Sequence, residues 1–309
     1  MPSTNLPLVV ILGPTAVGKT EIAIQLAEGL GGEIVSADSR LFYRGMDIGT
    51  AKPTPAERGH VPHHLIDVAD PDEIWSLTVF QDAAHQAIAG IHYRRRLPFL
   101  VGGTGQYVRA VIEGWQVPQT APDSQWRAVL ESWAAEVGAQ GLHARLASLD
   151  PQAALSIDYR NVRRTLRALE VILRTGRRFS ELRGRGGSPY RTLLLGLTRP
   201  RSELYARIDN RIEGMLAAGL LDEVQDLLQE GYSPNLPTLS AIGYQEMIAY
   251  LDGKITLEEA AAAMKRRTRQ FVRRQANWFK ESDPEIRWSR VGPETVDDLQ
   301  RMIRDWLKN

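Results

Sequence analysis

The chain has 309 residues, 43% of them hydrophobic and 24% charged, and this composition excludes a disordered or collagen-like chain. The absence of cysteine excludes disulfide bonds, thiolate zinc sites and a cysteine nucleophile. A formal net charge of +1 indicates no partner by itself, and the apolar run at residues 6–12 is too short for a signal peptide or a membrane span. We therefore expect a cytoplasmic protein that does not contact membranes.

Apolar segments alternate with helical patterns along the N-terminal third of the chain. Strands are predicted at residues 8–12, 33–36 and 98–101, and helices at residues 21–29 and 75–90. This alternation is typical of a parallel sheet whose strands are joined by crossover helices. The predicted fold class is therefore α/β, a P-loop NTPase-like parallel sheet with flanking helices.

The segment between the first predicted strand and the first predicted helix matches the complete phosphate-loop pattern G-x-x-x-x-G-K-[ST]. Its position matters because a strand and a helix must bring backbone N–H groups together around one anion. Lys19 supplies a positive charge, and the Thr20 hydroxyl can hold Mg²⁺ against the phosphates. We therefore predict a phosphate site formed by Gly13, Pro14, Thr15, Ala16, Val17, Gly18, Lys19 and Thr20.

Polar or glycine-rich segments follow the second and third predicted strands. Asp38 comes shortly after residues 33–36, and Thr104 lies in the glycine-rich segment after residues 98–101. Ligands in open α/β sheets bind at such strand ends, so Asp38 and Thr104 should share a crevice with the phosphate loop. Asp38 there can accept a proton from a nucleophile or lie near the metal. The alternative is a structural aspartate that caps a helix or a turn.

An ATPase with this loop normally has an aspartate at the end of a hydrophobic strand, where it orients Mg²⁺ and water. The nearest candidate strand, residues 99–101, runs straight into Gly102 and Gly103. The pattern therefore favours a loop that holds a diphosphate as a leaving group over one that hydrolyses a γ-phosphate.

Strand signals vanish between about residues 122 and 178, where apolar residues recur at helical spacing. We interpret this stretch as an inserted helical subdomain, followed by a Gly/Arg-rich connection at residues 183–189 and a strand at residues 192–197. Helices are then predicted at residues 203–218, 220–229, 244–251 and 257–279. The expected domains are a catalytic core of residues 1–115 and 190–309, with basic C-terminal helices, and a helical subdomain of residues 116–189.

Two arginines, Arg207 and Arg211, lie four residues apart on one predicted helical face. Paired guanidinium groups suit a diphosphate, because each can form two bonds to phosphate oxygens. The alternative is a solvated helical face on which Glu203 and Glu213 neutralise the arginines.

Two segments are strongly basic, residues 160–178 and residues 265–280. Like charges at this density are best explained by a polyanion that neutralises them, although an ordinary solvated face is the alternative for either segment. The aromatic residues of the second segment, Phe271, Trp278 and Phe279, are expected in the core rather than stacked on bases. A phosphate site together with two basic surfaces indicates chemistry on a nucleic acid.

Distinctive strings recur along nearly the whole chain, at residues 13–20, 34–39, 43–53, 63–67, 101–107, 167–170, 207–211, 241–246 and 268–275. Together they resemble the tRNA dimethylallyltransferases, also called tRNA isopentenyltransferases. The strings at residues 45–53 and 243–244 are far more specific than the phosphate loop, which unrelated folds share. The chain is similar to the shorter bacterial type, since without cysteine it cannot form the C-terminal zinc finger of the eukaryotic relatives.

The resemblance implies transfer of a dimethylallyl group from dimethylallyl diphosphate to N6 of adenosine 37, beside the anticodon of tRNAs that read codons beginning with U. It implies that Asp38 is the general base on the adenine amine, that Thr20 and Arg211 hold the diphosphate with Lys19, and that Mg²⁺ is the cofactor. The helical subdomain and the basic C-terminal helix would grip the phosphates of the anticodon stem-loop. Recognition of one stem-loop does not demand a dimer, so we expect a monomer. The residues at the tRNA contact would be Asp38, Ser39, Arg40, Leu41, Thr104, Arg127, Arg163, Arg164, Thr165, Leu166 and Arg167.

Two other functions remain open from the residues alone. A small-molecule or nucleoside kinase would use the same loop with ATP and Mg²⁺, with Asp38 as base on a hydroxyl and residues 183–191 as a lid. An ATP-gated RNA-binding protein would leave Asp38 and the paired arginines without a role. Transfer of a labelled dimethylallyl group to RNA without ATP would distinguish the leading hypothesis from both.

Overall fold

The structure is a computed structural model that describes residues 6–116, 118, 123–182 and 184–308. It divides into two compact units, an α/β unit of residues 1–112 and 188–309 and a helical unit of residues 113–187. The expected first residue of the helical stretch, Pro122, and the first residue of the Gly/Arg-rich connection, Arg183, lie outside the described residues.

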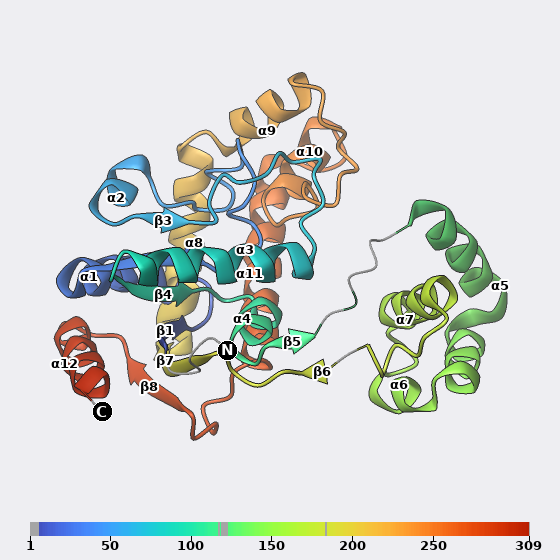
Figure 1. Cartoon of the computed structure of the whole chain (residues 1–309). Coiled ribbons are helices and arrows are strands. Elements are labelled where there is room, and N and C mark those ends of the chain that lie inside the picture. Colours follow the sequence, from blue (N-terminus) through green and yellow to red (C-terminus); the bar gives the residue numbers. More distant parts are fainter. Residues whose placement is uncertain (1–5, 117, 119–122, 183, 309) are drawn as a thin grey trace. The chain divides into compact units, whose positions relative to one another are not determined.

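Parallel strands form the centre of the α/β unit (Figure 1). Within the described ranges the sheet has six strands in the order β3-β2-β4-β1-β7-β8, and every neighbouring pair is parallel. Strands β2 and β4 are buried along their whole length, as expected for a parallel sheet that is covered on both faces. The strands are β1 (Leu6–Leu12), β2 (Gly32–Ser36), β3 (His63–His64), β4 (Leu97–Val101), β7 (Tyr190–Thr198) and β8 (Ile286–Arg290).

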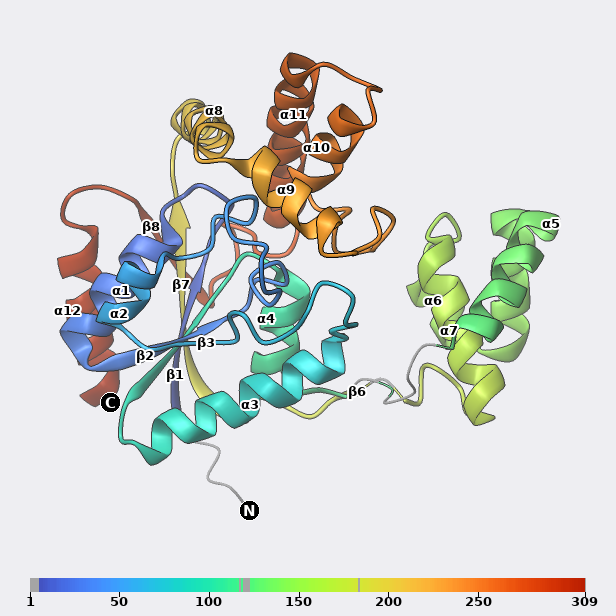
Figure 2. The same cartoon turned by 90° about the horizontal axis from the view of Figure 1, so that it is seen from above.

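Helices cover both faces of this sheet. Helix α1 packs with α12 on one face, while α3 and α4 pack together on the other (Figure 2). Each of these helices contributes buried apolar side chains to one continuous core. Their bounds, with those of the short α2, are α1 (Lys19–Leu30), α2 (Pro55–His60), α3 (Leu77–Tyr93), α4 (Gly105–Ile112) and α12 (Thr295–Lys308).

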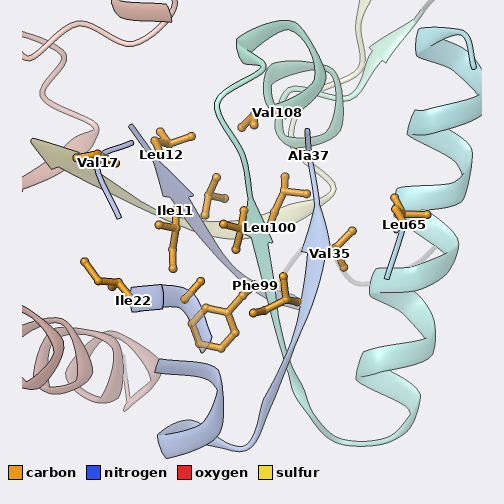
Figure 3. Close-up of a cluster of buried hydrophobic side chains, with 14 of the residues drawn as sticks. Ile11, Leu12, Val17, Ile22, Val35, Ala37, Leu65, Phe99, Leu100 and Val108 are labelled. Atoms are coloured by element: carbon orange, nitrogen blue, oxygen red, sulfur yellow. The ribbon is translucent and has the colours of Figure 1, made fainter. Parts of the chain in front are cut away.

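The core lies between neighbouring strands and the helices that follow them. Ile11 of β1 and Phe99 of β4 are fully buried, and Ile22 of α1 and Val108 of α4 belong to the same cluster (Figure 3). Burial of such side chains contributes about 1.5–3 kcal/mol each. The packing fixes the strand ends from which the phosphate loop and the glycine-rich segment emerge.

A group of four helices follows β7 in the described part of the α/β unit. Helix α8 packs against α11, and α10 packs against both α9 and α11. The fully buried ring of Tyr244 and the buried Met264 join these helices to the core of the α/β unit. The bounds are α8 (Arg201–Ala217), α9 (Leu220–Gln229), α10 (Tyr244–Leu251) and α11 (Leu257–Ala276).

The helical unit has a core of its own. Helix α5 (Ser124–Leu149) packs against α6 (Pro151–Ser156) and α7 (Val162–Thr175), around fully buried residues such as Leu142 and Leu169. Helix α5 is interrupted at Gly138, whose φ of 72° and ψ of 172° are not helical. Strands β5 (Trp115–Gln116) and β6 (Gly184–Arg185) form a short antiparallel ribbon.

The strands and long helices predicted from the sequence are confirmed, with ends that shift by a few residues. The predicted helix at residues 257–279 ends earlier, at Ala276. Strand β8 and helix α12 were not predicted. The β5–β6 ribbon was not predicted either, because two-residue strands carry no periodic pattern. Part of the connection expected at residues 183–189 is therefore the strand β6, which pairs with β5.

Candidate active site

The phosphate loop occupies the turn between β1 and α1. Gly13 and Gly18 have φ of 147° and 108°, backbone conformations that residues with a side chain rarely adopt. A Cβ at Gly13 would also lie 2.8 Å from the carbonyl oxygen of Leu197. The loop therefore needs glycine at both positions in order to turn tightly at the N-terminus of α1.

Two arginines hold the outward carbonyl groups of this loop. Arg207 Nε donates to the Ala16 carbonyl at 2.8 Å, and Arg199 Nε donates to the Val17 carbonyl at 2.8 Å. These bonds fix the loop at the N-terminus of α1, where the first N–H groups have no partner within the helix and can bind an anion. Sequence reasoning missed Arg199, which follows β7 and has no spacing signal.

Lys19 lies within the same loop, and its Nζ donates to the Pro14 carbonyl at 2.9 Å. Burial lowers its pKa from 10.5 to about 8, with a smaller effect in the same direction from Arg211 and an opposing effect from Asp38. A bound anion would restore the preference for the charged ammonium group. Lys19 is therefore poised to exchange a backbone carbonyl for a phosphate oxygen.

A cavity of about 460 Å³ opens in front of the loop. Its wall carries the positive groups that a phosphorylated ligand needs, together with the carboxylates of Glu21, Asp38 and Glu57. Lining residues include Gly18, Lys19, Thr20, Asn210, Arg207 and Arg211.

The acidic neighbours of Arg207 and Arg211 bind other residues. Glu203 pairs with Arg199, and Glu213 pairs with Lys265 at 2.8 Å. The alternative in which Glu203 and Glu213 neutralise the two arginines is therefore not found, although Arg207 itself is exposed. Arg211 donates to the Thr50 carbonyl at 3.4 Å. The pKa of Arg211 is lowered, mainly by burial and to a smaller extent by Arg207, while the charge of Asp38 opposes the shift.

A second cavity, of about 370 Å³, adjoins the first. The phosphate loop, the end of β2, the glycine-rich segment after β4 and α11 all contribute to its wall, so Asp38 and Thr104 share a crevice with the loop as predicted. The residues that line both cavities are Thr15, Asp38, Thr50 and Arg211.

Asp38 also forms a local turn. Its Oδ1 accepts a hydrogen bond from the Arg40 N–H at 3.0 Å, and its own N–H donates to Ser36 Oγ at 3.3 Å. The structural and functional interpretations of this residue are compatible, because the turn uses one carboxylate oxygen and the residue still lines both cavities. The turn fixes the orientation of the carboxylate.

The neighbours of Asp38 divide between the two cavities. Ser39 and Arg40 line the second cavity, and Leu41 lines the first. Arg40 is also anchored by a hydrogen bond of 3.1 Å from its guanidinium to the Thr238 carbonyl.

The glycine-rich segment after β4 is closely packed. A Cβ at Gly103 would lie 2.3 Å from Nε2 of Gln275, and one at Gly105 would lie 2.2 Å from Cγ of Trp278. These glycines let Gln275 of α11 and Trp278, just beyond the helix, pack closely against the segment after the strand.

Carboxylates of the protein neutralise part of the positive charge of the basic segment on α11. Carboxylates of α8 and α10 accept three ion pairs, Lys265–Glu213 at 2.8 Å, Arg267–Glu246 at 2.5 Å and Arg269–Asp209 at 2.6 Å. The expectation that this charge has only a polyanion to neutralise it is therefore corrected.

The aromatic residues near the end of α11 have two different roles. Phe279 is buried in the core, as predicted. Phe271 and Trp278 instead line the second cavity, and Trp278 is 38% exposed, so their expected place in the core is wrong. Sequence periodicity alone could not separate these positions.

The distinctive string at residues 43–53 is held by a carboxylate from α9. Glu223 accepts backbone N–H bonds from Asp47, Ile48 and Gly49 at 2.9, 2.6 and 3.1 Å, and a bond of 2.6 Å from the Tyr244 hydroxyl. This network holds the segment that carries Thr50 into both cavities. Glu223 was missed from the sequence because its partners are backbone groups about 175 residues away.

In the helical unit, a buried carboxylate organises two of the predicted tRNA-binding residues. Glu170 is 2% exposed, and its oxygens lie 2.9 Å from Arg167 and 3.8 Å from Arg127. The Asp123 N–H also donates to it at 2.7 Å. Both guanidinium groups therefore face the same carboxylate, which joins the first turn of α5 to the middle of α7.

The remaining predicted residues of α7 face in different directions. Arg163 and Arg164 are exposed. Thr165 is fully buried and donates to the Asn161 carbonyl at 3.2 Å, and Leu166 packs on the core of the helical unit. The side chains of Thr165 and Leu166 thus support the helix, while the arginines present charge.

No group of three or more His, Asp or Glu side chains that could hold a metal ion occurs in the part of the chain that the structure describes. Nor does any helix within that part have the length and apolar character needed to cross a bilayer. A metal ion at Thr20 would depend on ligand phosphates for most of its coordination, which is usual for Mg²⁺.

Two family models match the chain, one described as IPP transferase over residues 41–282 and one as isopentenyl transferase over residues 6–65. A tRNA dimethylallyltransferase of Roseiflexus sp. (strain RS-1) is 55% identical over 306 residues, which cover 98% of this chain and 99% of the relative.

Solved structures are similar as well. The full-length tRNA isopentenylpyrophosphate transferase of Bacillus halodurans is 44% identical, with a TM-score of 0.73 over 98% of this chain and 97% of that chain. A eukaryotic dimethylallyltransferase described as acting on tRNA is 28% identical, with a TM-score of 0.81 over 97% of this chain and 78% of that chain. Sequence and structure agree, and the chain belongs to the IPP transferase family.

Proposed function

We propose that this protein transfers a dimethylallyl group from dimethylallyl diphosphate to N6 of adenosine 37 in tRNAs that read codons beginning with U, giving N6-(dimethylallyl)adenosine and diphosphate. The observation that carries the proposal is the position of Asp38, which lines both the cavity at the phosphate loop and the cavity along α11. A carboxylate shared by two cavities suits a reaction that joins two substrates. The names of the relatives support the same reaction.

The cavity at the phosphate loop suits the diphosphate. Charge accumulates on this group as the allylic C–O bond breaks, and the loop amides, Lys19 and Arg211 are placed to stabilise it. Arg207 lines the same cavity, with its Nε already committed to the Ala16 carbonyl. Each interaction strengthens as negative charge develops, which lowers the barrier to departure.

The cavity along α11 suits the adenine base. Its volume of about 370 Å³ falls within the usual range for small-ligand sites, and Phe271 and Trp278 provide apolar surface. The N6 amine is a weak nucleophile because its lone pair is conjugated with the ring, so orientation and proton removal are both needed. Asp38 accepts that proton as N6 bonds to the allylic carbon. The base must first be extruded from its stack in the RNA.

Thr20 is the residue that would hold Mg²⁺. Its exposed hydroxyl lies at the start of α1 within the phosphate cavity, which fits an ion that takes most of its ligands from phosphates and water. A bound Mg²⁺ would supply further charge to the diphosphate.

The exposed arginines of the helical unit suit the phosphates of the anticodon stem-loop. Arg163 and Arg164 present charge on the surface, and Arg127 and Arg167 are held by Glu170. Contacts of this kind give affinity and orientation without sequence information. Recognition of one stem-loop does not require a second subunit, and we propose a monomer.

Membership in the IPP transferase family favours prenyl transfer over the kinase. The strand end at Val101 also leads into glycine where an ATPase places its aspartate. Neither observation gives ATP a role in the reaction.

The proposal is tested by incubating the protein with an unmodified anticodon stem-loop RNA and labelled dimethylallyl diphosphate, with and without ATP. Label on the RNA without ATP is the expected result. A strict requirement for ATP, or no label with RNA that the protein demonstrably binds, would overturn the proposal. An RNA with guanosine in place of adenosine 37 is the matched control and should remain unlabelled.

A further inference from the structure

Gln275 lies in the last turn of α11, and its side chain is buried, with 8% of the residue exposed. Its Oε1 accepts a hydrogen bond from the Thr15 N–H at 2.9 Å, and its Nε2 donates to the Gly103 carbonyl at 3.1 Å. One amide side chain thereby joins the phosphate loop, the glycine-rich segment after β4 and the basic helix. A buried amide that satisfies both its donor and its acceptor is costly to replace.

The peptide unit that Gln275 binds is also bound by Lys19. The Thr15 N–H and the Pro14 carbonyl belong to the same planar peptide group, and Lys19 Nζ donates to that carbonyl at 2.9 Å. Rotation of this peptide would disturb both bonds together. Gln275 therefore controls the orientation of the carbonyl that Lys19 must release in order to reach a diphosphate.

The same helix forms one wall of the cavity proposed for the base. Phe271, Arg274 and Gln275 of α11 line it, as does Trp278 just beyond the helix end. A ligand pressed against this wall contacts the segment that holds the Pro14–Thr15 peptide. The two cavities are thus connected by a continuous set of hydrogen bonds, which is the physical requirement for energetic coupling.

We propose that Gln275 is a positioning residue that couples the two cavities, so that RNA bound against α11 tightens the diphosphate site through the Pro14–Thr15 peptide. This inference rests on the proposed function, because it takes an RNA base to be the occupant of the cavity along α11. Coupling between two sites is reciprocal, so diphosphate must tighten RNA binding by the same factor.

The test measures the dissociation constant of inorganic diphosphate with and without saturating anticodon stem-loop RNA. The dissociation constant without RNA, divided by the constant with RNA, is the coupling ratio, and it should be about 5 or more in the unaltered protein. Gln275→Met keeps the side-chain length and removes both hydrogen bonds, and the ratio should fall to about 1. Gln270→Met places the same substitution on an exposed position of α11, and its ratio should match that of the unaltered protein.

A second variant keeps the test decisive if Gln275→Met does not fold. Gln275→Glu retains an acceptor for the Thr15 N–H and loses the donor to Gly103 when it is ionised. Its coupling ratio, divided at each pH by that of the unaltered protein, should recover as the pH falls and the carboxyl group gains a proton. A ratio that does not change with pH in this variant contradicts the inference.

The outcomes separate this inference from the proposed function. Coupling that survives in Gln275→Met, or a ratio of about 1 in the unaltered protein, overturns the inference even if prenyl transfer occurs. Transfer of the prenyl group is measured separately in the unaltered protein. Absence of transfer there would overturn the proposed function. Coupling that is present in the unaltered protein and lost on substitution of Gln275 would still support the role of Gln275 as a positioning residue.

Discussion

Two basic helices, α11 of the α/β unit and α7 of the helical unit, use their positive charge differently. On α11, Lys265, Arg267 and Arg269 are paired with carboxylates of neighbouring helices, and the helix forms a wall of a cavity. On α7, Arg167 is paired with Glu170, but Arg163 and Arg164 are exposed and line neither cavity. Exposed arginines also occur on α11, at positions 266, 273 and 274. Charge that is fixed by protein partners shapes a site, whereas exposed charge provides attraction to a polyanion.

The comparison predicts that changes in the α/β unit affect chemistry and changes in the helical unit affect RNA affinity. Asp38 and Lys19 lie in cavities of the first unit. Glu170 and Arg163 belong to the second. Substitutions at these positions test whether the two units have separate roles.

The largest effect is expected from Asp38→Asn. Asparagine keeps an oxygen for the Arg40 N–H, so the turn is preserved, but it cannot take the proton of the amine. Loss of a general base lowers kcat about 10²–10⁴-fold, with RNA affinity unchanged. Single-turnover transfer and RNA binding measure the two quantities. A variant with nearly full kcat removes Asp38 as the base.

The next effect concerns Lys19 and pH. Burial lowers the pKa of Lys19 to about 8 in the absence of ligand, so its charge is lost as the pH rises through 8. Diphosphate affinity should therefore fall above about pH 8, and Lys19→Met should lower it about 10- to 100-fold below that pH. Calorimetric titration with inorganic diphosphate measures both effects. Lys19→Met that shows the same fall above pH 8 contradicts this assignment.

The same pKa shift has a consequence for stability. Between about pH 8 and 10.5 the folded chain has lost the proton of Lys19, while the unfolded chain retains it. Stability from this group therefore rises with pH across that window, because the cost of burying the charge is relieved. Lys19→Met should remove this part of the pH dependence of unfolding.

A smaller effect is expected from Glu170→Gln in the helical unit. The amide retains an acceptor for the Asp123 N–H and loses the charge that faces Arg167. We expect destabilisation of about 1–3 kcal/mol, measured by denaturant unfolding. Glu131→Gln changes an exposed residue of α5 in the same way and should be neutral. Equal stability of the two variants would show that the buried pair does not support the unit.

The smallest effect is expected from the combined change Arg163→Gln and Arg164→Gln. RNA affinity should fall several-fold and the slope of log affinity against log salt should weaken by about 1–2, because two exposed charges are lost. The single-turnover rate at saturating RNA should be unchanged. Arg304→Gln, on the exposed face of α12, is the control. A lower saturated rate in the double variant would break the division between the two units.

Much of the fold follows from local patterns. Residues 8–12 and 98–101 are apolar throughout, as parallel strands covered on both faces must be, and they form most of β1 and β4. Helices α9 and α10 have exactly the predicted bounds. Strand β8, at the edge of the sheet, was missed although its residues alternate between apolar and polar as in a strand with one exposed face. Strand order depends on packing between distant segments and has no local signal.

Some residues of the candidate site also have a local sequence signal, and others do not. The phosphate loop, Asp38 and Arg211 could be identified because each carries a chemical pattern or a position at an element end. Gln275 and Glu223 could not, because they act on backbone groups 260 and 175 residues away. Phe271 and Trp278 have the spacing of core residues and line a cavity instead.

The sequence by itself determined the alternation of strands and helices, the phosphate loop and the family, since these depend on contiguous residues. The tertiary structure decided which side chains share a cavity and which charges are neutralised within the protein. Hydrogen bonds and ion pairs act over a few ångströms, so they depend on distances that residue numbers do not record. The position of Asp38 between two cavities is a property of the folded chain alone.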